Sequence, residues 1–325
     1  MPIKIVELDR FRGCLLGLAA GDAVGTSAEF MPRGSFPPIT GMHGGGPFAL
    51  NPGEWTDDTS MALCLAQSLL EVGGFDAADQ MRRYCDWQER GYMSSNGSCF
   101  DIGITVSRAL ERFRSTGDPF SGSSDPRTAG NGSIMRLAPI PMAVHGQPEL
   151  LDQWCKDSSR TTHAASECLE ACVLLGRMLQ RALRGESKEQ ILFSEPSQDF
   201  SQTTIHLLAE GHYRAYARED LRGSGYVIRS LEAALWCFWT TDSFEQSILT
   251  AANLGEDADT TAAVCGQLAG AHYSEIGIPS KWLSTLTQVE QIRFVADNLK
   301  SRTSSGPEQP PFNARISNEG IIGKP

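Results

Sequence analysis

Apolar residues recur at intervals of three and four positions along most of this chain, and this period limits the fold more than any other feature. Such spacing places apolar side chains on one face of an α-helix. Strand-like alternation over four or more positions is scarce, so we predict an all-α fold. Gly13, Gly17 and Gly21 recur every four positions on the first segment and predict close contact with another helix. The segments with a helical pattern are 8–19, 58–70, 75–90, 101–114, 163–183, 201–218, 226–238, 243–252, 259–273 and 286–299.

The helical pattern also indicates how the chain is divided. Residues 1–300 show no repeat of fixed period, and we predict one compact helical bundle over that range. Residues 301–325 are rich in Ser, Gly, Pro and Asn, so we expect a flexible C-terminal tail there. The long loops 31–57 and 115–133 are unusual in a compact helical domain, and loops of that length often carry function.

Charge and cysteine content exclude several classes of protein. The chain has 39 acidic and 28 basic residues and a formal net charge of −11, which repels phosphate backbones, so we expect no general nucleic-acid binding. No window approaches eighteen apolar residues without charge, and we expect no membrane span. Nine cysteines without a Cys-x-x-Cys pair indicate free thiols in a reducing compartment, which predicts a cytoplasmic protein.

Two acidic clusters each stand at the start of a predicted helix. Thr56, Asp57 and Asp58 follow a loop rich in Gly and Pro, and helix capping alone explains such a cluster. The second cluster, residues 256–260, has three carboxylates within four positions, which is more than a cap requires. Carboxylates so close together repel one another unless a cation joins them. Carboxylates and Thr hydroxyls suit Mg²⁺ or Mn²⁺, and two such sets could hold two ions side by side.

A phosphatase is an alternative interpretation of the second cluster. Residues 257–261 (DADTT) fit the DxDx[TV] pattern of haloacid-dehalogenase-type phosphatases, in which the first Asp is a nucleophile at the end of a parallel strand. The residues before Asp257 do not have the pattern of a buried strand, and no alternation of strands and helices surrounds them.

Seven short elements, spread in order over residues 10–285, carry a resemblance to a known family. The elements are 13–17 (GCLLG), 21–25 (GDAVG) with Glu29 shortly after, 55–59 (WTDDT), 100–103 (FDIG), 130–136 (GNGSIMR), 161–163 (TTH) and 255–260 (GEDADT). In these elements the chain resembles the ADP-ribosylhydrolase family, which includes the dinitrogenase reductase-activating glycohydrolase. The resemblance implies an all-α bundle of the ADP-ribosylglycohydrolase type.

The resemblance also implies a centre of two Mg²⁺ or Mn²⁺ ions at the mouth of a cleft. The implied metal ligands are Thr56, Asp57, Asp58, Asp257, Asp259 and Thr260. Catalytic roles are implied for Asp101, Glu29 and Asp58, and Glu29 also lies beside the bound ligand. From sequence alone, a helix N-cap is the simpler interpretation of Asp101.

Further positions match the ADP-ribose site of the family. The implied binding residues are Glu29, Gly130, Asn131, Gly132, Ser133, Met135 and His163. On their own, residues 130–133 indicate only a turn, and His163 indicates a cap or surface group at a helix start. Glycines also let backbone amides approach phosphate oxygens. Arg136 receives no role.

The function implied by the resemblance is hydrolysis of the C1″ glycosidic bond that links ADP-ribose to a protein side chain. Arginine is the favoured acceptor because the resemblance is closest to the arginine-directed bacterial type. Serine-linked, poly- or O-acetyl-ADP-ribose are alternative substrates, and a non-catalytic ADP-ribose-binding module is an alternative function. We expect a monomer whose partner is the ADP-ribosylated protein.

Overall fold

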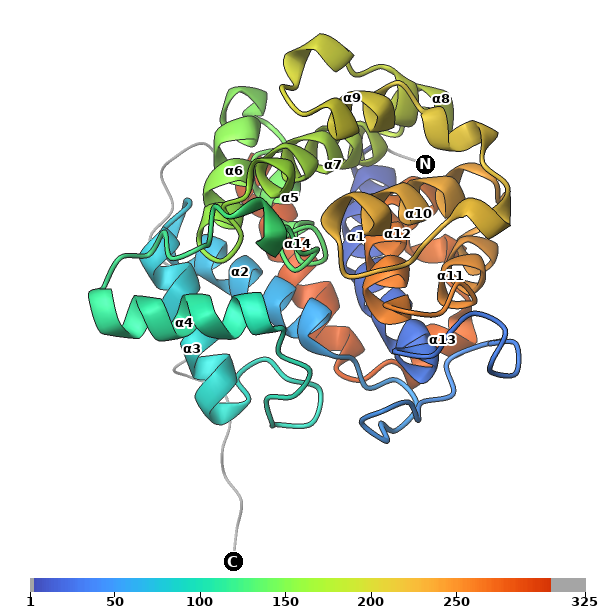
Figure 1. Cartoon of the computed structure of the whole chain (residues 1–325), viewed down its shortest axis with the longest axis horizontal. Helices are drawn as coiled ribbons and strands as arrows, with labels where there is room; N and C mark the ends of the chain where they lie inside the picture. Colours follow the sequence, from blue (N-terminus) through green and yellow to red (C-terminus); the bar gives the residue numbers. More distant parts are fainter. Residues whose placement is uncertain (1–2, 305–325) are drawn as a thin grey trace, which may run out of the picture.

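Two helices from opposite ends of the chain, α1 (Ile3–Gly25) and α12 (Ala258–Tyr273), lie side by side through the middle of the protein (Figure 1). Their contact is the most extensive of any pair of elements in this computed structural model, which describes residues 3–304. The other helices pack around this pair. Because the two helices come from distant parts of the sequence, their packing closes the domain.

Glycines on both helices let the two backbones approach closely. A Cβ atom placed on Gly13 would lie 2.2 Å from the carbonyl oxygen of Gly270, and one on Gly17 would lie 2.3 Å from that of Gly266. Gly21 is equally close to the backbone of α12. The close helix contact predicted from these glycines is therefore confirmed.

The prediction of an all-α fold is also confirmed. The described residues form fourteen α-helices, and their only β-type pairings are isolated bridges. None of these helices is long and apolar enough to cross a bilayer. The nine cysteines are free, as predicted. Besides α1 and α12, the helices are α2 (Asp57–Val72), α3 (Ala77–Arg90), α4 (Ile104–Thr116), α5 (Pro139–Ala143), α6 (Leu151–Arg160), α7 (Ser166–Arg184), α8 (Lys188–Phe193), α9 (Thr203–Ala209), α10 (Val227–Trp239), α11 (Phe244–Ala252), α13 (Ser280–Thr285) and α14 (Val289–Ser304).

Several predicted helix bounds are wrong. The predicted helix over 201–218 is only α9, because the chain turns at Gly211, whose φ of 73° lies in the left-handed region. The helices α5, α6, α8 and α13 were not predicted at all. At the C-terminus, α14 runs past the predicted domain boundary at residue 300, and most of the predicted tail lies outside the described residues.

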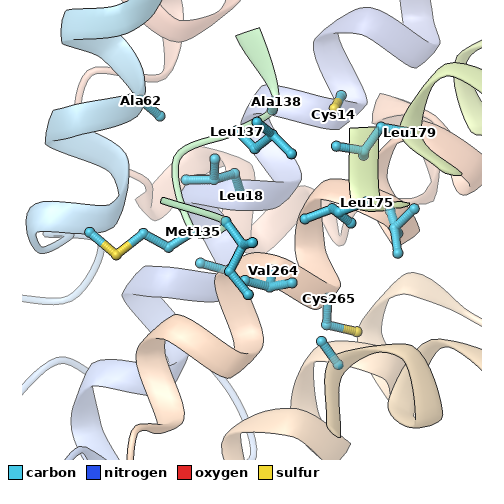
Figure 2. Packing of buried hydrophobic residues seen from close by; sticks show 14 of the residues in the cluster. Cys14, Leu18, Ala62, Met135, Leu137, Ala138, Leu175, Leu179, Val264 and Cys265 are labelled. Atoms are coloured by element: carbon cyan, nitrogen blue, oxygen red, sulfur yellow. The ribbon is translucent and has the colours of Figure 1, made fainter. Parts of the chain in front are cut away.

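The hydrophobic core joins α1, α2, α7 and α12 to the segment that leads into α5. Its side chains are almost fully buried, and each large one contributes about 1.5–3 kcal/mol relative to exposure. Core residues labelled in Figure 2 are Cys14, Leu18, Ala62, Met135, Leu137, Ala138, Leu175, Leu179, Val264 and Cys265. The core therefore reaches Met135, next to the segment predicted to bind ADP-ribose.

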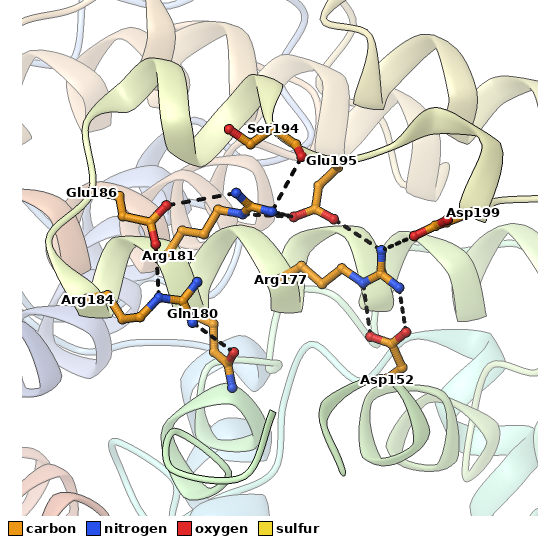
Figure 3. Close-up of polar contacts among 9 residues, drawn as sticks. All are labelled: Asp152, Arg177, Gln180, Arg181, Arg184, Glu186, Ser194, Glu195 and Asp199. Carbon is orange, nitrogen blue, oxygen red and sulfur yellow. Dashed lines mark hydrogen bonds and ion pairs between the residues drawn. The ribbon is translucent and has the colours of Figure 1, made fainter. Parts of the chain in front are cut away.

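Ion pairs fasten the outer face of α7 to its neighbours (Figure 3). Arg177 binds Asp152 of α6 at 2.6 Å and also contacts Glu195 and Asp199, while Arg181 binds Glu195 at 2.7 Å. Because each guanidinium has carboxylate partners, this cluster is explained as a structural connection between α6, α7 and the segment after α8.

Candidate active site

The two acidic clusters meet at the N-termini of α2 and α12. Thr56 and Asp257 occupy the N-cap positions, but neither side chain caps its helix. The Thr56 hydroxyl instead lies 3.4 Å from Oδ2 of Asp259, and the Thr260 hydroxyl lies 3.4 Å from Oδ2 of Asp58. Helix capping, the alternative explanation of these clusters, therefore does not account for these side chains.

A further carboxylate, Asp22 of α1, accepts hydrogen bonds from residues at the start of α2. Its Oδ1 accepts hydrogen bonds from the amide and hydroxyl of Thr56, at 2.9 and 3.0 Å. Its Oδ2 accepts from the amide and hydroxyl of Thr59, at 3.1 and 2.6 Å. Asp22 is fully buried, and burial raises its pKa to about 6. Asp22 was not predicted as a site residue, although it lies in the GDAVG element at 21–25.

No positively charged side chain of residues 3–304 forms an ion pair with the aspartates of the junction. Buried oxygens of Glu29, Asp58 and Asp259 have no hydrogen-bond partner among residues 3–304. Burial, followed by the charges of neighbouring carboxylates, raises the pKa values of Asp58 and Asp259 well above their usual range. Buried anions that have neither partners nor hydrogen bonds are costly. Orphaned carboxylate oxygens beside Thr hydroxyls therefore fit a site for a hard divalent cation.

The carboxyl groups of Glu29 and Asp101 lie beside the acidic junction at the start of α12. Ligand atoms of Glu29, Asp101 and Asp259 all lie within 4.8 Å of one another. Burial, then the charges of Asp101 and Asp257, raises the pKa of Glu29 to about 10, and burial raises that of Asp101 to about 7. Such a group of acids can bind a cation or exchange protons.

Left-handed backbone occurs at Asp101 and directly after Glu29. Asp101 has a φ of 59°, and Phe30, which follows Glu29, has a φ of 60°. Both values lie in the left-handed region. The Phe30 amide donates to the carbonyl of Glu256 at 2.6 Å, which ties this segment to the second acidic cluster. The interpretation of Asp101 as an N-cap is wrong, because α4 begins at Ile104 with Gly103 as its N-cap.

A cavity of about 410 Å³ opens above the acidic junction, within the range of small-molecule sites. Thr56, Asp58 and Ser133 are not among its lining residues, and the first two lie beneath it. The hydroxyl of Ser133 instead accepts a contact from the Cys172 thiol at 3.4 Å. The predicted site residues that line the cavity are Glu29, Asp57, Asp101, Gly130, Asn131, Gly132, Met135, His163, Asp257, Asp259 and Thr260.

The segment 130–135 forms one wall of the cavity and is anchored on both sides. Gln267 of α12 donates to the carbonyl oxygens of Ile134 and Met135, at 3.1 and 2.9 Å. The amide of Asn131 donates to the carbonyl of Gly225, and its side chain donates to Oδ2 of Asp257 at 2.8 Å. The Asn131 side chain thus orients an acid of the second cluster.

His163 lies against this segment, but not at a helix start as predicted. It belongs to the turn before α7, which begins at Ser166 after the extended residue Ala165. A Cβ atom on Gly130 or Gly132 would lie 3.3 or 3.2 Å from Nε2 of His163. The absence of side chains at these two glycines therefore makes room for the imidazole.

The phosphatase alternative does not agree with this geometry. Asp257 follows a loop at the start of α12, and the described part of the chain contains no parallel sheet that could present it as a nucleophile. Its side chain is instead held by Asn131 beside the other acids.

Comparisons with known proteins agree on one family. Residues 4–308 match the ADP-ribosylglycohydrolase family profile. The chain is 44% identical to the ADP-ribosylarginine hydrolase Tri1 of Serratia proteamaculans, over 90% of this chain and 79% of that protein. It is 34% identical to the ADP-ribosyl-[dinitrogen reductase] glycohydrolase of Rhodospirillum rubrum, over 90% and 95%. A solved ADP-ribosylglycohydrolase-related protein complex matches with a TM-score of 0.82 and 43% identity, over 91% of this chain and 99% of that one.

Proposed function

The chain belongs to the ADP-ribosylglycohydrolase family, and on this premise we propose that it removes ADP-ribose from arginine side chains of modified proteins. In this reaction an oxygen of water bonds to C1″ of the distal ribose as the bond from C1″ to the guanidine nitrogen breaks. The proton lost by water goes to that nitrogen. The observation that carries the proposal is the convergence of both acidic clusters, Glu29 and Asp101 on one cavity of about 410 Å³.

Arginine is the proposed acceptor because relatives that are 44% identical over most of this chain are ADP-ribosylarginine hydrolases. All the residues of the proposed site come from one chain, and we propose that it acts as a monomer. Its nine free thiols support a reducing compartment, the cytoplasm.

The acidic junction is the proposed site of two Mg²⁺ or Mn²⁺ ions. The residues that would hold them are Thr56, Asp57, Asp58, Asp257, Asp259 and Thr260, with Glu29 beside them. One detail supports this set. If the Thr56 hydroxyl gives its single proton to Asp22, only lone pairs remain to face Asp58 and Asp259, and a cation between them relieves that repulsion. Divalent cations at such a site orient sugar hydroxyls and polarise a bound water.

The residues of the chain divide the remaining tasks. Asp101, on the wall of the cavity, exchanges a proton with water or with the leaving nitrogen as the C1″ bond breaks, and Glu29 is the second candidate for that step. The backbone of residues 130–132 contacts the pyrophosphate and the adjacent ribose, since glycines let the chain approach these oxygens. The Asn131 side chain orients Asp257 through a hydrogen bond, while the backbone of Asn131 forms part of this wall of the cavity.

A panel of substrates tests the proposal. Proteins ADP-ribosylated on arginine and on serine, together with O-acetyl-ADP-ribose, are each incubated with the protein in Mg²⁺, Mn²⁺ or EDTA. We expect release of ADP-ribose from the arginine substrate with a cation and none in EDTA. Survival of every linkage with both cations would overturn the hydrolase assignment.

Variants of the acidic junction make the same test at the level of single residues. Asp57→Ala and Asp259→Ala should each abolish release of ADP-ribose. Asp86→Ala is the matched control, because the Asp86 side chain forms only a surface ion pair with Arg90 among residues 3–304. Full activity in either Asp57→Ala or Asp259→Ala would remove the junction from the mechanism.

A further inference from the structure

Arg136 is a fully buried cation that has no role in the proposed reaction. No carboxylate lies within 4.0 Å of its guanidinium in the part of the chain that the structure describes. The group lies over the ring of Tyr84, with 4.7 Å between its central carbon and the ring centroid. Its shortest hydrogen bond runs from Nη2 to the hydroxyl of Thr162, at 2.7 Å. A buried charge without a counter-ion is expensive, so this position requires an explanation.

The hydrogen bonds of Thr162 determine which way its hydroxyl proton points. The hydroxyl oxygen accepts from Arg136, and it also lies 2.8 Å from Nδ1 of His163. An arginine can only donate, so the hydroxyl proton remains free for Nδ1. If Nδ1 carried the proton instead, the hydroxyl would accept twice and its own proton would have no partner among the described residues. Pairing of the Thr162 hydroxyl proton with Nδ1 therefore places the imidazole proton on Nε2.

The protonated nitrogen lies beside Gly130 and Gly132, two residues that line the cavity. His163 is only 2% exposed, yet it lines the cavity, and its Nε2 has no hydrogen-bond partner within residues 3–304. The two glycines at 130 and 132 leave space around this atom. A buried ring that lines the cavity and has one nitrogen without a hydrogen-bond partner beside two cavity-lining glycines is placed to contact a ligand.

We propose that Arg136 and Thr162 are positioning residues that hold His163 in the tautomer protonated at Nε2, so that the ring donates to an acceptor oxygen of bound ADP-ribose. The identity of the ligand rests on the proposed function, whereas the tautomer does not. The charge of Arg136 supports the arrangement in a second way. Burial, followed by this charge, lowers the pKa of His163 to about 3, so the ring stays neutral and keeps one donor and one acceptor.

The tautomer can be read directly in the unaltered protein. The full-length chain is labelled with ¹⁵N at its six histidines, and His163 is assigned from the signals lost in His163→Gln. We expect a protonated Nε2 and an unprotonated Nδ1, both without ligand and with ADP-ribose. A protonated Nδ1 would overturn the proposal whatever the variants show.

A matched pair of variants tests the role of the hydroxyl. Thr162→Val keeps the shape of the side chain but removes its hydroxyl, and Thr162→Ser retains it. We expect Thr162→Val to give a mixture of tautomers and to weaken ADP-ribose binding in calorimetry about 10-fold, the effect of roughly one hydrogen bond. Thr162→Ser should keep the wild-type tautomer and affinity.

The outcomes separate this inference from the function on which it partly rests. A fixed tautomer and unchanged affinity in Thr162→Val would overturn the role of Thr162 and Arg136 while leaving the hydrolase assignment intact. A wild-type protein that does not bind ADP-ribose would instead contradict the proposed function. Thr162→Val removes the shortest hydrogen bond of Arg136 and leaves Nη2 with two contacts of 3.4 Å, so the thermal unfolding of the variant is measured in parallel. If the variant does not fold, the wild-type spectrum decides.

Discussion

Asp22 accepts two hydrogen bonds from Thr56 with the same carboxylate oxygen, one from the backbone amide at 2.9 Å and one from the hydroxyl at 3.0 Å. The contact joins α1 to the start of α2. The bond to Asp22 is the shortest of the three that this hydroxyl can form with carboxylates, and a proton given to Asp22 leaves the lone pairs of the hydroxyl to face Asp58 and Asp259. Substitution of a residue that orients a metal ligand through a hydrogen bond commonly lowers the affinity for the metal.

Replacing Asp22 by Asn should therefore weaken cation binding. Asn can accept from Thr56, but its amide nitrogen cannot accept from Thr59, and the change also removes a negative charge from the junction. Both effects lower the affinity for Mn²⁺, and we expect a loss of roughly 10–100-fold in calorimetric titration. Asp86→Asn, a surface change of the same kind, should bind as the wild type. An unaltered affinity in Asp22→Asn would show that Thr56 needs no support from α1.

Sequence patterns identified the acids of the site more reliably than the residues behind them. Asp57 and Asp259 were predicted because clustered carboxylates point to metal chemistry, and Glu29 was predicted from the family resemblance; all three line the cavity. Asp22 and Arg136 also lie in elements that carry the family resemblance, 21–25 and 130–136. Their hydrogen-bond partners, Thr56 and Thr162, are 34 and 26 positions away in the sequence. Pairings of that kind exist only once the helices have packed, so spacing along the chain could not indicate them.

The packing of α1 on α12 gives a prediction about stability. Gly17 has ordinary helical backbone, but a Cβ atom there would lie 2.3 Å from a backbone oxygen of Gly266, and backbone cannot move aside cheaply. We expect Gly17→Ala to destabilise the protein by about 3 kcal/mol, at the upper end of the usual cost of overpacking. In Gly74→Ala the nearest atom is 3.9 Å away, on Trp154, and the cost should be below about 1 kcal/mol. Denaturant unfolding measures both, and equal stability of the two variants would contradict the close contact.

The helices themselves were predicted to different extents. Long segments with a clear period, such as α2 and α12, were located within a few residues, whereas α6 and α8 were missed. Tertiary contacts explain part of the difference. The charged side chains of α7 form ion pairs with Asp152 on α6 and with Glu195 just after α8, and these contacts are not visible in local periodicity.

Removing divalent cations should make stability depend on pH in a defined direction. Burial raises the pKa of Asp22 to about 6, of Asp101 to about 7 and of Glu29 to about 10, from roughly 4 in the unfolded chain. A carboxyl group with a raised pKa contributes stability that is complete below its unfolded pKa and is lost as the pH rises through the folded value. The parts of this loss due to Asp22 and Asp101 are complete by about pH 6 and pH 7, so Glu29 is the group of the three that still loses its proton above pH 7. In EDTA, the melting temperature should therefore continue to fall between about pH 7 and pH 9.

Mg²⁺ should reduce that fall, because a bound cation compensates the charges that appear. The comparison is confined to neutral and alkaline pH. Burial lowers the pKa of His163 to about 3, so this residue costs stability as the pH falls below about 6.5 and would confuse an acid series. Melting temperatures that coincide with and without Mg²⁺ from pH 7 to pH 9 would argue against a cation site.

Substitutions of Asp101 and Asp57 should have different effects, because we propose that Asp101 exchanges a proton and that Asp57 binds metal. Asn at position 101 keeps the shape of the side chain and tolerates the left-handed φ of 59°, so Asp101→Asn changes proton chemistry with little backbone cost. We expect its kcat to fall roughly 10²–10⁴-fold while Mn²⁺ affinity stays within about threefold of the wild type. Asp57→Asn should instead lose Mn²⁺ binding in the same titration. Because Asp101 also lies within 4.8 Å of ligand atoms of Glu29 and Asp259, a collapse of metal affinity in Asp101→Asn would reassign it as a ligand and leave Glu29 as the proton-exchanging group.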